Sequence, residues 1–391
     1  MSKRKKILWV SDGVILTGFG RVAHSIIGNL PNNRYEIHHL AVNYYGDPHN
    51  YKHKIYPAAL RGDVYGLNRI PEFANLDFDL IFIFNDAWII NEYLIKIKEH
   101  FKKIPPIVVY FPVDGRNHDP KWYLNFDLVT IPVVYTQFGY DVAKKVYPEG
   151  DYKIIYHGVD SDTFYKTKTS RSRIKKELYP KNPEIYEDSF IVLNANRNQP
   201  RKRIDMSIKG FALFVEGRPK NIKYYHHAGT QDAGWDVIKL CKSLDIEDRL
   251  ILTSTVNIIP GVSDERMNHV YNACDVGINT STGEGWGLTS FEHAATKAAQ
   301  VVPNHSACAE IWPGNAEMLD IHFSLTNEKI LTEGQFVSPD DLADALEKLY
   351  EDPKYLKEMS EKAYKFVKQE KYTWKAVGKQ WDELFTEVLE E

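Results

Sequence analysis

Three glycines and two glutamates lie close together in residues 279–292, which read NTSTGEGWGLTSFE. An apolar run precedes this segment and apolar residues at helical spacing follow it, so the pattern predicts a strand, a glycine-rich turn and a helix start. Glycines let backbone N–H groups approach a phosphate, and the positive end of a helix dipole contributes about 0.3 to 2 kcal/mol. The pattern therefore predicts an anion site at Gly285, Trp286, Gly287 and Leu288.

The two glutamates have a different expected target. Glu284 lies in the turn and Glu292 lies one turn into the predicted helix. Carboxylates do not bind a phosphate directly, so their natural targets are hydroxyl groups of a sugar or a ribose. Two alternatives stay open: Glu284 is a solvated turn residue, or Thr289 and Glu292 form a capping box in which the glutamate folds back onto the N-cap amide.

With these residues the chain resembles the GT-B retaining glycosyltransferases, in particular glycosyltransferase family four (glycosyl transferases group 1). The Glu-x₇-Glu motif of that family, usually written E-G-F-G-L-P-x-x-E-A, is similar to EGWGLTSFEHA in residues 284–294. Its G-R followed by K-x-x-D resembles NRNQPRKRID in residues 196–205. Its N-G-V-D-x-x-x-F resembles residues 157–164, and its Y-x-x-A-D-V resembles residues 271–276. The resemblance covers nearly the whole chain, most strongly 150–312.

The resemblance implies a role for each matching residue. Arg197 and Lys202 would hold the diphosphate of a nucleotide-sugar donor, Glu292 the ribose hydroxyls and Glu284 the transferred sugar. Charge-assisted hydrogen bonds contribute about 1.5 to 3 kcal/mol each, which suits a diphosphate in a closing cleft. A solvated basic loop is the alternative for the two cations. Base contacts in such folds are largely backbone contacts, here around residues 254–260, so the donor base is not legible.

Gly18 and Gly20 form a Gly-x-Gly-x-x-Ala pattern that superficially fits a dinucleotide-binding fingerprint. However, seven residues separate the predicted strand at residues 7–10 from Gly18, and the second strand ends at Asn43 without an acidic residue. The resembled family has a glycine loop here that faces the donor phosphates and sugar across the cleft. A left-handed turn before a helix is the alternative.

The chain departs from the family after the predicted strand at residues 107–111. Many members carry a histidine there, beside the transferred sugar, whereas this chain reads YFPVDG with Asp114. Asp114 either takes that role or is a loop residue. Thr289 replaces the usual proline, which frees it to act as an N-cap, and KAAQ in residues 297–300 replaces the common C-G-x-P.

The reaction implied by the resemblance is the transfer of a hexose, with retention at the anomeric carbon, to a hydroxyl of a glycan, lipid-linked or small-molecule acceptor. The donor is mannose on GDP-mannose or glucose on UDP-glucose, and Glu284, Asp114, Arg197 and Lys202 are the candidate catalytic residues. No metal or other cofactor is expected, because the two cations and the helix N-terminus would neutralise the leaving diphosphate.

Asp-x-Asp patterns at residues 77–79 and 160–162 resemble those of metal-dependent transferases, but the first simply precedes a strand. Two other functions stay open: a nucleotide-sugar 2-epimerase, which needs no acceptor, and a non-catalytic protein that binds sugar nucleotides.

Short apolar runs alternate with helix-period segments almost from end to end, which predicts an α/β fold. Strands that are apolar throughout indicate two doubly wound parallel-sheet, Rossmann-like domains, and the resemblance implies that they face a cleft as in GT-B. The alternation fails in residues 163–188, where basic residues crowd. We therefore expect an acceptor-side domain in 1–170 and a nucleotide-sugar-binding domain in 171–372, with a C-terminal helix in 373–391 completing the first.

Composition excludes several other classes. A net charge of -4 gives no basic surface for nucleic acid. No segment approaches 18 apolar residues, so no transmembrane segment is predicted. Three widely spaced cysteines indicate neither disulfides nor a zinc site, which suits a cytoplasmic location. The basic run at residues 3–6 leaves peripheral contact with an anionic membrane surface open.

Overall fold

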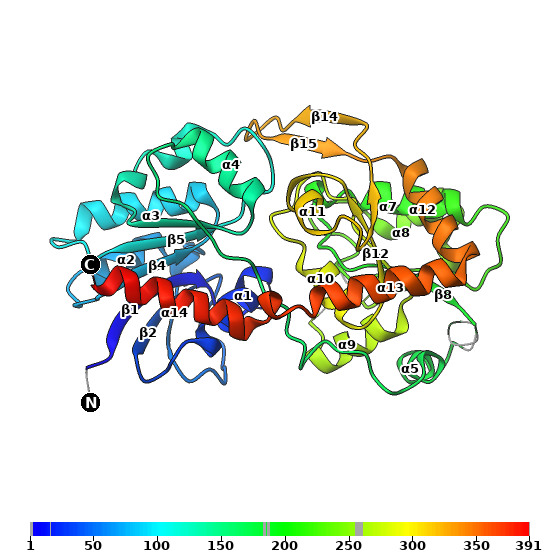
Figure 1. The fold of residues 1–391 in the computed structure, drawn as a ribbon, viewed down its shortest axis with the longest axis horizontal. Helices are drawn as coiled ribbons and strands as arrows, with labels where there is room; N and C mark the ends of the chain where they lie inside the picture. Colours follow the sequence, from blue (N-terminus) through cyan, green and yellow to red (C-terminus); the bar gives the residue numbers. More distant parts are fainter. Residues whose placement is uncertain (1–2, 16, 183–184, 186–187, 255–260, 391) are drawn as a thin grey trace. The chain divides into compact units, whose positions relative to one another are not determined.

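The computed structural model describes residues 3–15, 17–182, 185, 188–254 and 261–390. The chain divides into two compact units. The first comprises Met1–Gly158, Lys329–Thr332 and Trp374–Glu391, and the second Val159–Glu328 and Glu333–Thr373. Each unit holds one parallel sheet with helices packed against it, which confirms the predicted pair of doubly wound α/β domains (Figure 1).

The sheet of the first unit has seven strands in the order β3-β2-β1-β4-β5-β6-β7, and every pairing is parallel. The strands are β1 (Lys5–Asp12), β2 (Tyr35–Val42), β3 (Lys54–Pro57), β4 (Leu80–Phe84), β5 (Ile107–Phe111), β6 (Ile131–Val134) and β7 (Lys153–Ile154). The α-helices are α1 (Gly18–Asn29), α2 (Ile70–Phe73), α3 (Ala87–His100), α4 (Gln137–Val146) and α14 (Trp374–Glu390). Four short 3₁₀ turns lie in the connections between these elements.

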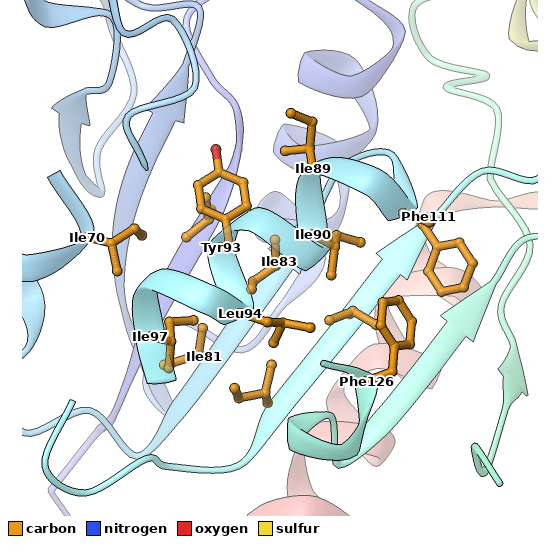
Figure 2. Close-up of a cluster of buried hydrophobic side chains, with 14 of the residues drawn as sticks. Ile70, Ile81, Ile83, Ile89, Ile90, Tyr93, Leu94, Ile97, Phe111 and Phe126 are labelled. Atoms are coloured by element: carbon orange, nitrogen blue, oxygen red, sulfur yellow. The ribbon is translucent and has the colours of Figure 1, made fainter. Parts of the chain in front are cut away.

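Apolar side chains cover both faces of this sheet. On one face, Ile90, Leu94 and Ile97 recur at helical spacing along α3 and pack over Ile81 and Ile83 of β4 (Figure 2). Because alternate residues of a strand point to opposite faces, Phe82 lies on the other side. The strands are therefore apolar at every position, as expected for a parallel sheet buried between two layers.

The C-terminal helix α14 covers that second face. Trp381, which is fully buried, lies with its ring centroid 5.1 Å from that of Phe82 and 4.8 Å from that of Tyr110. Phe385 of the same helix approaches Trp9 of β1 at 6.4 Å. The aromatic residues that recur along α14 are thus the inner surface of the first unit.

The sheet of the second unit has six parallel strands in the order β10-β9-β8-β11-β12-β13. They are β8 (Phe190–Asn194), β9 (Ile222–His226), β10 (Leu250–Leu252), β11 (Val276–Ile278), β12 (Ala299–Pro303) and β13 (Glu317–Leu319). The helices are α5 (Arg171–Leu178), α7 (Ile204–Phe214), α8 (Val237–Ser243), α9 (Asp264–Ala273), α10 (Leu288–Ala295), α11 (Ser306–Ile311), α12 (Pro339–Glu351) and α13 (Pro353–Val367). An antiparallel hairpin, β14 (Phe323–Thr326) and β15 (Glu333–Phe336), joins β13 to α12.

The first unit ends at Gly158, earlier than the predicted boundary at residue 170. The intervening segment is tied to α9 of the second unit: the amide of Tyr165 donates to Asn268 Oδ1 at 3.1 Å, and that of Thr167 donates to Asn272 Oδ1 at 3.0 Å. These side-chain contacts join residues about a hundred positions apart in sequence, so composition alone does not indicate them.

Both sheets share a feature that locates ligand sites. In the first sheet β1 lies between β2 and β4, and in the second β8 lies between β9 and β11, so the strand order reverses at β1 and at β8. Open parallel sheets bind ligands outside the carboxyl ends of the strands at such a switch point. The second sheet should therefore bind a ligand with the loops that follow β8 and β11, which are the two loops that carry the predicted charged residues.

Candidate functional site

The loops after β8 and β11 are joined by hydrogen bonds. The amide of Thr282 donates to the carbonyl oxygen of Arg201 at 2.8 Å, and the hydroxyl of Thr280 donates to that of Arg203 at 2.9 Å. Two segments that lie about eighty residues apart in the chain are thereby held side by side at the switch point.

Glu284 is a buried carboxylate, 4% exposed, with donors around it. Its Oε1 pairs with the ammonium of Lys202 and accepts hydrogen bonds from Asn279 Nδ2 at 2.9 Å and from the hydroxyl of Ser281 at 3.0 Å. Its Oε2 lies 3.7 Å from Nη1 of Arg201. Since a buried charge must be paired and hydrogen-bonded, this environment explains its burial, and the alternative of a solvated turn carboxylate is wrong.

The pKa of Glu284 reflects two opposing effects. Burial raises it, while the charges of Lys202 and Arg201, with hydrogen bonds from Lys202 and Asn279, lower it more strongly, to about 2. The carboxylate is therefore ionised at neutral pH and can only accept hydrogen bonds. Its chemistry suits a hydroxyl donor and excludes direct contact with a phosphate oxygen.

A second layer of hydrogen bonds positions the Glu284 backbone. The Glu284 amide donates to the hydroxyl of Ser306 at 3.0 Å, and His305 contacts the Ser281 carbonyl through Nε2 at 2.9 Å and the Ser306 hydroxyl through Nδ1 at 3.0 Å. Burial lowers the pKa of His305 to about 4, so the ring is neutral at pH 7. Because a carbonyl only accepts, Nε2 carries the hydrogen and Nδ1 accepts from Ser306.

Helix α10 begins at Leu288, as predicted, but its N-cap is Gly287 with φ of 93°. That left-handed conformation favours glycine. Thr289 therefore lies inside the helix, and the capping-box alternative for Glu292 is wrong. The buried carboxylate of Glu292 instead accepts a hydrogen bond from the hydroxyl of Tyr271 at 2.8 Å.

Trp286 does not present its ring to solvent. The side chain is 3% exposed and packs on Phe291 and Tyr372, with centroid distances of 4.8 Å and 5.9 Å. Its ring anchors the turn from inside, so only the backbone around Gly285 and Gly287 can serve the predicted anion site.

Arg197, the first predicted diphosphate cation, has another partner. Its Nε donates to Asp232 Oδ2 at 2.7 Å and its Nη2 to Oδ1 at 3.4 Å. The hydrogen bond from Arg197 lowers the pKa of Asp232. The structure thus brings Lys202 to Glu284, and pairs Arg197 with a different carboxylate.

Sequence reasoning missed Arg201 and Arg203, although both adjoin Lys202. Arg201 reaches the carbonyl of Gly283 and lies beside Glu284. Arg203 adopts φ 47° and ψ 50° at the N-cap of α7, and its guanidinium lies 5.2 Å from the ring centroid of Trp235. The run of three cations was a visible signal, but it does not indicate where each side chain points.

Gly18 and Gly20 lie in the first turn of α1. Thr17 caps this helix: its hydroxyl oxygen accepts from the Gly20 amide at 3.0 Å and its hydroxyl donates to Asp12 Oδ2 at 2.6 Å. A Cβ on residue 20 would lie 2.5 Å from the Ile15 carbonyl oxygen, so the close approach itself requires glycine. Asp12, a buried carboxylate that sequence reasoning missed, has a pKa raised by burial. The role of the two glycines toward a donor stays a prediction.

Asp114 follows β5 and is half-buried. His118 lies near it: burial lowers the pKa of His118 to about 4, against the opposing charge of Asp114, and His118 Nδ1 lies 2.8 Å from the hydroxyl of Tyr123. A histidine therefore adjoins Asp114 a few residues later than the position at which the family pattern places one. The catalytic role of Asp114 stays a prediction.

The two Asp-x-Asp patterns have structural partners. Asp79 accepts from the Lys5 ammonium and the Lys6 amide, and Asp160 accepts from the amides of Asp162 and Thr163. In the part of the chain that the structure describes, no three His, Cys, Asp or Glu side chains are grouped so that they could hold a metal ion. In the same part, no helix combines the length and apolar character needed to cross a membrane. Of the segment expected near a donor base, residues 255–260 lie outside the described residues.

Comparison with known proteins agrees with this geometry. Residues 175–366 match the sequence model of the family described as "Glycosyl transferases group 1". That range includes both loops at the switch point of the second sheet. No curated protein matches the chain.

Solved structures share the fold along nearly the full chain. A sucrose-phosphate synthase from Thermosynechococcus elongatus has a TM-score of 0.75 at 14% identity, over 98% of this chain and 99% of that chain. HepE from Anabaena, in complex with UDP and glucose, has a TM-score of 0.71 at 15% identity, over 98% of this chain and 100% of that chain. An E. coli structure described as trehalose-6-phosphate bound with UDP-2-fluoro glucose has a TM-score of 0.69 at 12% identity, over 99% of each chain. At these identities the likeness establishes the fold, which is the GT-B architecture.

Proposed function

We propose, from a GT-B chain whose second half carries a glycosyl transferases group 1 domain, that this protein transfers a hexose from a nucleoside-diphosphate sugar to a hydroxyl group of an acceptor. The transfer proceeds with retention at the anomeric carbon and without a metal ion. The diphosphate binds between the loops after β8 and β11, and the sugar lies at Glu284.

The meeting of Lys202 with Glu284 at the switch point carries this proposal. Lys202 supplies a compact positive charge with three donors, which suits a phosphate oxygen. Glu284 is held ionised at a position where it can accept from sugar hydroxyls. A cation for the diphosphate and a carboxylate for the sugar therefore lie one side chain apart.

Donor binding redistributes the charges in this site. Without donor, Glu284 neutralises Lys202 and lies 3.7 Å from Arg201. A diphosphate adds negative charge, so it competes with Glu284 for both cations. Once Lys202 turns toward the phosphates, an Oε1 lone pair of Glu284 becomes free to accept from the sugar.

The leaving group and the flattened sugar ring need opposite charges. Negative charge develops on the diphosphate as the glycosidic bond breaks, and Lys202 with the N-terminus of α10 stabilises it. Positive charge develops on the sugar ring, next to the ionised Glu284. Arg197 joins the diphosphate after leaving Asp232, since its half-exposed side chain is able to turn.

UDP-glucose is the first donor to test, because two of the similar structures hold UDP with glucose or a glucose analogue. GDP-mannose is the second. Backbone contacts from the segment that contains residues 255–260 would select the base.

Product analysis tests the proposal. The protein is incubated with each nucleotide-sugar, with and without a panel of hydroxyl acceptors, and the products are identified by mass spectrometry and by the anomeric coupling in proton NMR. We expect release of nucleoside diphosphate and a product that keeps the anomeric configuration of the donor. A donor converted to its sugar epimer without acceptor identifies an epimerase, and binding without turnover identifies a non-catalytic protein; either result overturns the proposal.

A further inference from the structure

A hollow of about 220 Å³ lies in the second unit, away from the loops described above. Its lining includes Arg171 of α5, Asp275 immediately before β11, Lys297 shortly before β12 and Lys357 of α13. Two of these residues precede strands, so the hollow lies at the amino ends of the sheet. The candidate donor site lies at the carboxyl ends, on the opposite edge.

Two of the cations are balanced by carboxylates. Arg171 pairs with Asp275, which is 8% exposed and also accepts from the amide of Ile191 at 2.9 Å. Lys297 pairs with Glu361. These two ion pairs account for both acidic groups, and they leave the other lysines at the hollow uncompensated.

Lys166 is the most informative of these lysines. Its ammonium is half-buried and has no hydrogen-bond or ion-pair partner among the residues that the structure describes. Burial lowers the pKa of Lys166, and the charges of Arg171 and Lys297 lower it further, against the opposing charge of Asp275. A cation partly removed from water beside other cations costs free energy unless an anion compensates it.

Lys297 adds an independent observation. Its backbone has φ of 68°, a left-handed conformation that non-glycine residues adopt at a cost in free energy. Strain of this kind concentrates at functional sites, where surrounding structure imposes it. Here it holds a lysine at the wall of a hollow that already has an excess of positive charge.

We propose that this hollow binds a small phosphate-bearing anion, either free phosphate or the phosphomonoester of a small metabolite. Lys166 and Lys357 leave about two unpaired positive charges, and a phosphomonoester carries about -1.5 to -2 at neutral pH. The volume also suffices, since a water molecule occupies about 30 Å³ of the liquid and the hollow is several times larger. The crowded basic segment at residues 166–176 thereby has a ligand.

Thermal unfolding of the full chain, followed with inorganic phosphate and separately with glucose 6-phosphate, tests the proposal. Ionic strength is held constant with sodium chloride, because screening alone weakens repulsion between the lysines. We expect each anion that binds to raise the unfolding temperature as its concentration increases. The double variant Lys166→Gln/Lys357→Gln should bind at least about tenfold more weakly. A tighter effect of glucose 6-phosphate assigns the site to a phosphomonoester, and a tighter effect of inorganic phosphate assigns it to the free ion.

Two variants separate this site from other effects. Lys209→Gln removes a lysine charge from the exposed surface of α7 and should bind phosphate as the natural chain does. Lys202→Ala removes the proposed diphosphate cation and should also keep the response, so this test does not depend on the proposed function. The absence of any shift in the natural chain, or an unchanged response in the double variant, overturns the proposal.

Discussion

At the scale of single residues, the buried pair of Lys202 and Glu284 decides how the candidate site works. Burying an ion pair is costly, and apolar residues of similar volume often give equal or greater stability. Stability alone is therefore a poor reason for this pair, which agrees with a role in binding. The pair keeps Glu284 ionised and holds Lys202 in place until a donor displaces it.

The pH dependence of stability should reveal this pair. The pKa of Glu284 lies near 2, below its ordinary value of 4.5, so its contribution is present above pH 4.5 and is lost as the pH falls toward 2. We expect the free energy of unfolding of the natural chain to exceed that of Glu284→Gln by on the order of 3 kcal/mol at neutral pH, and the difference to shrink between those two values. Urea denaturation across this range measures it. A difference that does not vary with pH would contradict the assigned pKa.

The proposed contact between Glu292 and the ribose can be tested with a deoxyribose donor. If the carboxylate accepts from the ribose 2′-hydroxyl, the natural chain should bind the 2′-deoxy nucleotide about 10 to 100 times more weakly than the ribonucleotide. Glu292→Ala should bind both alike in calorimetry. Tyr271→Phe is the control, since it removes only the hydroxyl that donates to Glu292 and should keep the discrimination. Equal discrimination by Glu292→Ala would show that the ribose lies elsewhere.

At the scale of elements, the loop that carries Lys202 is fixed by the helix that follows it. Helix α7 packs closely on α12 at Gly210, where a Cβ would lie 2.8 Å from Leu342 Cδ2 and from the Pro339 carbonyl oxygen. Any side chain there would push the two helices apart. The close packing of α7 therefore supports the position of the loop before it.

Two glycine substitutions in helices should have opposite effects. Gly210→Ala should destabilise the chain by about 1 to 3 kcal/mol because it overpacks the contact with α12. Gly28→Ala lies in α1 with no neighbouring atom within 4 Å, and should stabilise by about 0.5 to 1 kcal/mol because alanine favours a helix. Urea denaturation midpoints measure both. Destabilisation by both substitutions would contradict the described packing.

Helices and strands could be predicted well from the sequence, because buried parallel strands are apolar at every position. The predicted strands at residues 80–84 and 107–111 have the observed bounds of β4 and β5. Helix α5 was not predicted, since basic residues dominate it and only a few positions, such as Ile174, are apolar and buried. The start of α10 was predicted at Leu288, but its cap was not, because a left-handed glycine and a threonine N-cap fit the same residues.

Side-chain pairing was less predictable than the elements. The two loops of the candidate site could be identified from glycines, charges and the family resemblance. The partners could not: Arg201 lies beside Glu284, Arg197 pairs with Asp232, and His305 fixes the turn from behind. These contacts depend on rotamers and on residues distant in sequence, about which local spacing carries no information.

At the scale of the whole molecule, two parallel sheets each have a switch point, and the charged loops of the second surround its own. The diphosphate site is assigned to this unit without a metal ion. Release of nucleoside diphosphate should therefore proceed at the same rate in excess EDTA as in buffer with magnesium. Product is measured by chromatography. Activity lost in EDTA and restored by Mg²⁺ or Mn²⁺ would contradict the metal-free reaction.

One binding cycle tests most directly whether the loops after β8 and β11 hold the diphosphate. Calorimetry compares UDP with uridine, and GDP with guanosine, for the natural chain and for Lys202→Ala/Glu284→Gln, a double variant that leaves no unpaired charge from the buried ion pair. We predict that the natural chain prefers the diphosphate of its own base, and that the double variant loses at least about tenfold of this preference. An unchanged preference would place the diphosphate elsewhere and contradict the proposed site.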